Sequence, residues 1–157
     1  MDNGGNLCFA VKKSLGKLSK WLRILGFDTV YEQDVLPEQF ALLMKQGRIC
    51  LTRSARVQRI DPSQTIIFIR ADKPLEQLRQ VVRALDLTSE DIKPFARCSR
   101  CNVPVESVDK QFVFGRVPDY IWETQHRFGI CSCCQRIYWP GSHTIRSKEI
   151  FRELFGL

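Results

Sequence analysis

The sequence predicts a small α/β sandwich with a mainly parallel sheet, followed by a smaller cysteine-rich module. Short apolar runs alternate with amphipathic helical stretches up to about residue 90, which is the order of parallel strands joined by helices. Two of these runs, 48–52 and 65–69, are continuous and β-branched, as in strands buried on both faces. Beyond them the pattern changes to paired cysteines. We expect a flexible lead-in over 1–6, an α/β domain over 7–90, and a cysteine module with a C-terminal helix over 91–157.

The α/β domain is expected to contain three helices between its strands. Ser14 is an N-cap candidate for the first helix, and Gly26 suits its end. The leucines of this helix recur at helical spacing and should face the sheet. Pro37 and Pro74 suit the first turns of the next two helices. In chain order the expected elements are strand 7–11, helix 15–25, strand 29–31, helix 36–46, strand 48–52, strand 65–69 and helix 74–85.

The cysteine module is expected to contain shorter elements. Alternating apolar residues predict a strand over 111–114, and residues 137–139 should complete a hairpin. Helices are expected over 118–126 and 147–157, the second of them capped by Ser147.

Two cysteine pairs share one spacing, Cys98 with Cys101 and Cys131 with Cys134. A C-x2-C unit places two thiolates on one tight turn, and two such turns supply the ligands of a tetrahedral Zn²⁺ site. Asn102 and Gln135, which follow the two pairs, suit the turns. We predict a zinc ribbon with a structural site, because four thiolates leave no position for water or substrate.

Other roles for the cysteines stay open. The four could be ordinary buried cysteines or two disulfides, although paired C-x2-C spacing is rarely accidental. Cys133 could replace Cys134 as a ligand, but the resulting C-x-C pair is less common in such turns. Cys8 and Cys50 lie in apolar runs and are expected to be small core residues.

Positive charge points to an anionic partner. The chain has 24 lysines and arginines against 17 acids, a formal net charge of +7, and nucleic acid is the leading candidate. Lys13, Lys17 and Lys20 share one face of the first expected helix, and no acid lies between Lys12 and Phe27. The alternative is a solvated polar helix face. The residues expected to contact RNA phosphates are Lys12, Lys13, Lys17, Lys20, Arg23, Arg53 and Arg56, with Arg59 on the same surface.

Acids are scarce where a catalytic metal would need them. Functional groups gather at the carboxyl ends of parallel strands, and a Mg²⁺ or Mn²⁺ nuclease needs converging carboxylates there. The candidates are Asp34, Glu38 and Asp72. For Asp34 and Glu38, solvation and dipole pairing at a helix start is the favoured interpretation.

The start of the chain contains no apolar stretch of signal-peptide or membrane-spanning length. Seven cysteines, an odd number, with metal-type spacing favour a reducing, intracellular compartment, either cytoplasmic or nuclear. We expect no membrane partner.

Several segments together resemble one family. They are FAVKKSLGKLSKWLRILGFD over 9–28, GRICLTR over 47–53, Cys101 with Asn102, and YWPGSH over 138–143. The combination resembles the PIN-like RNase domain that closes the mutator-seven type 3′–5′ exonucleases, over about residues 7 to 145. The resemblance implies a PIN-like three-layer sandwich with a zinc ribbon, association with single-stranded RNA, and a place in RNA silencing as the C-terminal part of an exoribonuclease.

Two positions depart from the family pattern. Lys12 and Ser54 stand where the family normally has aspartates at the centre of its metal site. An ammonium in place of a carboxylate sets a cation where Mg²⁺ would bind. We therefore expect an RNA-binding domain without nuclease activity. Two alternatives remain open: an active metal-dependent RNase that uses Asp34, Glu38 and Asp72, and a protein-docking module that meets an acidic partner.

Overall fold

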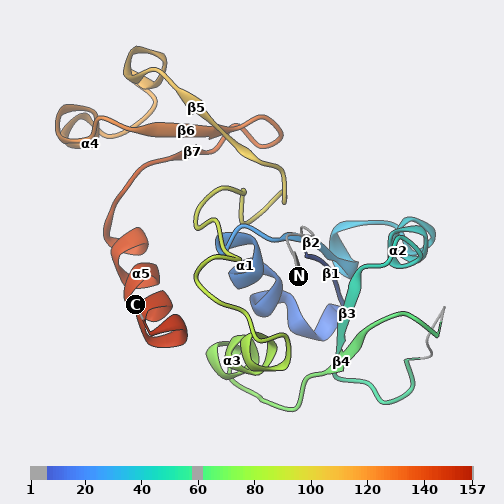
Figure 1. Ribbon diagram of the computed structural model, residues 1–157. Helices are drawn as coiled ribbons and strands as arrows, with labels where there is room; N and C mark the ends of the chain where they lie inside the picture. The colour runs from blue at the N-terminus through green and yellow to red at the C-terminus, as the bar shows by residue number, and fades with distance from the viewer. Residues whose placement is uncertain (1–6, 58–61, 157) are drawn as a thin grey trace. The chain divides into compact units, whose positions relative to one another are not determined.

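A computed structural model describes residues 7–57 and 62–156 of the chain. The chain divides into two compact units, Met1–Asn102 and Val103–Leu157 (Figure 1). The lead-in expected over residues 1–6, Arg59 and the final residue of the chain lie outside the described residues.

The first unit is built on a parallel sheet with strand order β2-β1-β3-β4. These strands are β1 (Cys8–Val11), β2 (Asp28–Tyr31), β3 (Ile49–Thr52) and β4 (Ile66–Phe68). The predicted parallel α/β fold is therefore confirmed. After β1 the chain continues to β2 on one side, and after β3 it continues to β4 on the other side. In parallel sheets, ligand-binding and catalytic sites lie at the carboxyl ends of two strands whose connections diverge in this way.

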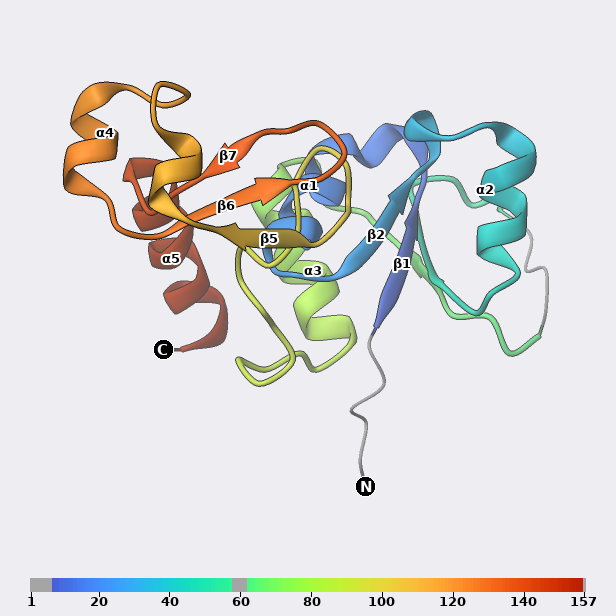
Figure 2. The same cartoon turned by 90° about the horizontal axis from the view of Figure 1, so that it is seen from above.

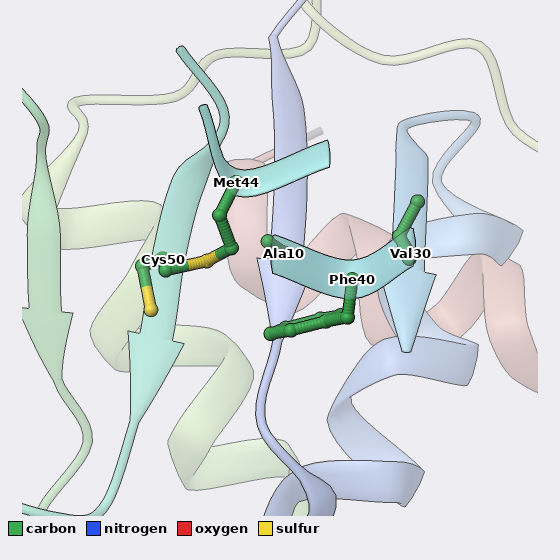
Figure 3. Close-up of a cluster of buried hydrophobic side chains, with 5 residues drawn as sticks. All are labelled: Ala10, Val30, Phe40, Met44 and Cys50. Carbon is green, nitrogen blue, oxygen red and sulfur yellow. The ribbon is translucent and has the colours of Figure 1, made fainter. Parts of the chain in front are cut away.

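Helices cover both faces of this sheet. Helices α1 (Gly16–Ile24) and α3 (Pro74–Ala84) lie on one face, and α2 (Pro37–Met44) lies on the other (Figures 1 and 2). Leu18 and Leu22 of α1 are fully buried, as their helical spacing predicts. On the opposite face Phe40 and Met44 of α2 pack against the sheet residues Ala10, Val30 and Cys50 (Figure 3).

Cys50 is a core residue, as predicted. It is 0% exposed, and burial raises the pKa of its thiol to about 11. A thiol with such a pKa is protonated at neutral pH and is a poor nucleophile or metal ligand. Cys8 is only half-buried and lies beside Asp28.

The start of α1 differs from the prediction. Ser14 lies inside a 3-10 helix, Lys13–Leu15, and the N-cap position of α1 is Leu15, which makes no side-chain capping hydrogen bond. The approach of Tyr31 explains the turn. Its hydroxyl donates to the Lys13 carbonyl (2.7 Å) and would lie 2.8 Å from a Cβ on Gly16, so the chain must turn closely around the phenol ring.

The end of α1 is as predicted. Gly26 has φ +97°, a left-handed conformation that L side chains rarely adopt. The Lys93 carbonyl oxygen would lie 2.3 Å from a Cβ at this position. The segment after α3 therefore passes close over the end of α1, where the Lys93 N–H donates to the Leu25 carbonyl (2.9 Å).

The second unit has an antiparallel sheet in the order β5-β6-β7. The strands are β5 (Val105–Val108), β6 (Phe128–Cys131) and β7 (Ile137–Tyr138), and the helices are α4 (Asp119–Thr124) and α5 (Ser142–Phe155). The sequence predicted β7 and α4 but missed β5 and β6. The strand expected over 111–114 was wrong. It is a 3-10 helix, Lys110–Val113, because only Val113 reaches the core while Phe112 and Phe114 stay exposed.

The terminal helix begins earlier than predicted. Ser147 is a buried residue inside α5 rather than its cap. The helix starts at Ser142, where the Thr144 hydroxyl accepts a hydrogen bond from the Gly141 N–H (3.3 Å) and satisfies one of the donors at the helix start.

The core of the second unit is small. It consists of Val113, Val117, Ile121 and Phe128, with Trp122 and Trp139 among the side chains packed against it. Trp139 packs in this core, as expected for a module with little else to bury. None of the helices within the described ranges has the length and apolar character that crossing a bilayer requires.

Candidate metal centre and nucleic-acid interface

The two cysteine pairs have the same local geometry. The Cys101 N–H points at the Cys98 sulfur (3.3 Å), and the Cys134 N–H points at the Cys131 sulfur (3.5 Å). The residues after the pairs, Asn102 and Gln135, have φ of +66° and +60°. This left-handed turn is tolerated best by residues such as asparagine. In both turns, therefore, the backbone folds back so that the N–H of the second cysteine donates to the sulfur of the first.

The sulfurs of Cys98, Cys101, Cys131 and Cys134 all lie within 4.8 Å of one another. Tetrahedral Zn²⁺ with sulfur at about 2.3 Å requires sulfurs roughly 3.8 Å apart, so the cluster fits such an ion with little movement. Within the described ranges this is the group of His, Cys, Asp and Glu residues that could hold a metal ion. Cys133 and His143 are exposed and are not members of it.

Arg23 fastens the first cysteine turn to the sheet of its own unit. Its guanidinium donates to the carbonyl oxygens of Thr29 (2.9 Å), Ser99 (3.2 Å) and Arg100 (2.9 Å). It also pairs with the Asp34 carboxylate (2.8 Å). Arg23 is 3% exposed, so its side chain lies inside the unit, whereas the sequence led us to expect it among the residues that contact RNA phosphates. A buried guanidinium needs fixed acceptors, and the backbone of the cysteine turn provides them.

Asn102 forms a second link between the same turn and β2. Its side-chain oxygen accepts from the Thr29 N–H (2.8 Å), and its side-chain nitrogen donates to Asp28 (2.7 Å). Asp28 also accepts two bonds from Arg48 (3.0 and 2.9 Å). Burial by itself raises the pKa of the Asp28 carboxyl, but the hydrogen bonds from Arg48 and Asn102 outweigh it and hold the pKa below its ordinary value.

At the carboxyl edge of the sheet, Lys12 makes an ion pair with Glu32. Lys12 follows β1, and Glu32 follows β2, which pairs with β1 in parallel. The other oxygen of Glu32 accepts from the Lys13 N–H (2.8 Å), and the Lys12 ammonium lies 5.2 Å from the centre of the Phe40 ring. The Lys12 ammonium is therefore half-buried at the carboxyl edge of the sheet, where the Glu32 carboxylate neutralises its charge.

The other acids named from the sequence are dispersed. Asp34 pairs with Arg23, and the 87%-exposed Asp72 pairs with Arg53 (2.6 Å). Glu38 is exposed in the first turn of α2. Ser54 accepts from the Arg56 N–H (3.3 Å) within a turn. The described residues thus do not bring Asp34, Glu38 and Asp72 into one metal-binding group.

The cationic surface retains its central residues. Lys13, Lys17 and Lys20 are exposed, as are Arg53 and Arg56, whereas Lys12 is half-buried in its pair with Glu32. On α1 the exposed lysines lie opposite the buried leucines. The helix therefore presents positive charge to solvent along the side that does not touch the sheet.

Two site residues were not predicted as such from the sequence: Glu32 was not identified, and Asn102 was expected only to suit a turn. Glu32 directly follows the strand expected over 29–31, and an acid at the carboxyl end of a parallel strand was the sequence signal that could have identified it. Asn102 was assigned only a turn, and its side-chain links to Asp28 and Thr29 have no local sequence signature.

Comparison with known families gives a match that covers most of the chain. The family model described as the Mut7-C RNAse domain matches residues 8–151, nearly the whole chain. No curated protein and no solved structure matches the chain.

The Lys12–Glu32 pair predicts an acid-shifted titration of Glu32. Burial alone would raise the pKa of this carboxyl, but Lys12 and the Lys13 N–H hold it below its ordinary value of 4.5. The stabilisation from ionised Glu32 is thus complete above pH 4.5 and is lost as the pH falls through the folded-state pKa. Carboxyl NMR should give a midpoint below 4.5.

Two variants test the cause of this shift. Lys12→Met should move the Glu32 midpoint upward, because the strongest favourable partner is lost. Lys13→Ala keeps the backbone N–H bond to Glu32 and should change the midpoint much less. A parent midpoint at or above 4.5 would contradict the ion pair as described.

Proposed function

Because the chain belongs to the Mut7-C RNAse domain family, we propose that it is an RNA-binding member of that family that has lost nuclease activity. The observation that carries the proposal is the Lys12 ammonium at the carboxyl end of β1, paired with Glu32. In a longer protein the domain would form the C-terminal part of a 3′–5′ exoribonuclease and hold RNA for a catalytic centre elsewhere in that protein.

Charge at the carboxyl edge supports the loss of activity. Two-metal or one-metal phosphodiester hydrolysis requires carboxylates that neutralise the ion and position it against the phosphate. Here the cations Lys12 and Arg53 lie at the ends of β1 and β3. Lys12 is paired with Glu32, and Arg53 is paired with Asp72. A Mg²⁺ ion would have to displace both pairs and would still meet two positive charges.

The exposed lysines of α1 support RNA binding. They lie on a helix whose opposite side is fixed against the sheet, so their positions are set by the fold while their ammonium groups stay in water. Contacts of this kind read the phosphate backbone and carry little sequence information. Single strands are the expected ligand, because the flexible backbone can follow a curved cationic surface.

We further propose that Cys98, Cys101, Cys131 and Cys134 hold one structural Zn²⁺. The support is the four-sulfur cluster and the N–H groups aimed at Cys98 and Cys131. Such N–H bonds offset part of the negative charge that four thiolates would bring to the ion. When bound, zinc would cross-link the two turns and would offer no reactive position.

A protein-docking role is a second candidate, favoured by one observation in the second unit. Phe112 and Phe114 are 54% and 66% exposed, and Arg116 lies over the Phe112 ring (4.9 Å). Exposed aromatic side chains beside arginine are typical of protein interfaces. This role is compatible with RNA binding by the first unit.

The zinc proposal predicts one Zn²⁺ per chain by elemental analysis. Cys98→Ser should release the ion and lower the melting temperature, because the binding free energy of structural zinc is also folding free energy. Cys133→Ser is the matched control, since Cys133 is exposed and outside the cluster, and it should keep both zinc and stability. A zinc-free chain, or a fully stable Cys98→Ser variant, would rule the site out.

RNA binding should depend on three exposed lysines, Lys13 of the 3-10 helix and Lys17 and Lys20 of α1. Changing Lys13, Lys17 and Lys20 together to glutamate should weaken single-stranded RNA binding by roughly tenfold or more, and should flatten the salt dependence by about one to three units. Fluorescence anisotropy across a salt series measures both. The matched control reverses the exposed cations Arg146, Lys148 and Arg152 of α5, which changes net charge equally and should have a smaller effect. Equal effects of both sets would show that only net charge matters, and salt-independent binding by the parent would favour the docking role.

The parent chain should not cleave RNA above background in Mg²⁺ or Mn²⁺. Lys12→Asp combined with Ser54→Asp would return carboxylates to the ends of β1 and β3 and should increase divalent-metal binding. Gel analysis of labelled RNA measures cleavage, and calorimetry measures metal binding. EDTA-sensitive cleavage by the parent that Asp72→Ala abolishes would instead establish the active-nuclease alternative.

A further inference from the structure

A hollow lies beside the lysines of α1. Its volume is about 290 Å³, and Lys17, Lys20, Trp21, Ile24 and Pro74 line it. The α1 residues among these have helical spacings of i, i+3, i+4 and i+7, so they form one stripe along the exposed side of the helix. Pro74, the first residue of α3, supplies the other wall, and α1 and α3 lie side by side in both views of the fold (Figures 1 and 2).

The lining combines two kinds of chemistry. The indole of Trp21 and the side chains of Ile24 and Pro74 are apolar, whereas the ammonium groups of Lys17 and Lys20 are exposed at the rim. A flat apolar group attached to an anion matches this combination. The volume is near the lower limit of ligand pockets, roughly 300 Å³, so it suits one planar ring system.

The hollow is also next to the carboxyl edge of the sheet. Helix α1 follows β1 and helix α3 follows β4, so both helices begin at that edge. A strand whose phosphates follow Lys13, Lys17 and Lys20 would pass the mouth of the hollow on its way to or from Lys12 and Arg53. A larger hollow of about 490 Å³ on α3 lacks this character, because its lining contains Glu76 and no aromatic side chain.

We propose that this hollow binds one unpaired base of an RNA strand, stacked on Trp21, while Lys17 and Lys20 hold the phosphates on either side. The proposal rests on the proposed function, because it assigns a base-binding subsite to the same RNA surface. A base in a duplex is already stacked and paired, and the hollow can accept only a base that has left the stack. The subsite therefore selects single-stranded over double-stranded RNA without reading sequence.

The fluorescence of Trp21 tests the proposal without changing Trp21. The chain has three tryptophans, Trp21, Trp122 and Trp139, so Trp122→Phe with Trp139→Phe leaves Trp21 as the reporter. Zinc content and melting temperature would verify that this background folds. Titration with a single-stranded RNA oligonucleotide should quench the signal strongly. An abasic ribose-phosphate oligomer of equal length and a duplex should quench it weakly.

Substitution of Trp21 separates stacking from charge. Trp21→Ala should weaken binding of single-stranded RNA by roughly fivefold or more, and Trp21→Phe should retain most of the affinity. Neither variant should change the salt slope, because no phosphate contact is removed. Tyr120→Ala is the control, since Tyr120 is a 65%-exposed aromatic residue of the second unit and should leave RNA affinity unchanged.

The outcomes distinguish the subsite from the RNA-binding function itself. If RNA and the abasic oligomer bind and quench alike, and Trp21→Ala binds like the parent while the Lys13, Lys17 and Lys20 variant is weakened, the hollow is not a base site and the proposed function stands. If the parent does not bind RNA at all, both are overturned. Should Trp21→Ala fail to fold, the fluorescence titration with RNA and with the abasic oligomer still decides the question.

Discussion

The buried guanidinium of Arg23 is the interaction on which the arrangement of the first unit depends. It links three segments that are distant in the sequence: helix α1, the start of β2, and the turn that carries Cys98 and Cys101. Removing any acceptor would leave part of a buried charge without compensation, which is among the costliest defects in a folded protein. Asn102 joins the same turn to β2 by two further hydrogen bonds. It accepts one from the neutral Thr29 N–H and donates one to the Asp28 carboxylate. The first cysteine turn is therefore held by the α/β unit before any metal binds.

The carboxyl edge of the sheet carries two ion pairs, Lys12 with Glu32 and Arg53 with Asp72. Lys12 and Arg53 are cations at the ends of neighbouring parallel strands, and Glu32 and Asp72 neutralise them. The Lys12 pair is half-buried, and the Arg53 pair is largely open to solvent, so the first is screened less and is harder to displace. A divalent metal ion at this edge would have to compete with Lys12 and Arg53 for the same two carboxylates.

Helix α1 has three different sets of contacts. One side packs its leucines on the sheet, and Arg23 reaches the cysteine turn. The remaining side carries exposed lysines and the half-buried Trp21, which lines the hollow. Because the buried side and Arg23 fix the helix from two directions, its outer side is a rigid surface. The helix backbone is therefore already ordered, and only the exposed lysine side chains would lose conformational freedom if a strand bound.

Sequence alone determined what depends on local pattern. The β-branched runs gave the parallel strands, the leucine spacing gave the inner side of α1, Gly26 gave its end, and the cysteine spacing gave the sulfur cluster. Only the tertiary structure decided where long polar side chains go. Arg23 follows the exposed Lys20 by three residues, a spacing that places both near one face of a helix. Arg23 is nevertheless buried, because the carbonyl oxygens of residues 99 and 100 accept hydrogen bonds from its guanidinium. The Lys12–Glu32 pair, strands β5 and β6, and the hollow at Pro74 likewise join residues far apart in the chain. Their partners are set by packing, which no local periodicity encodes.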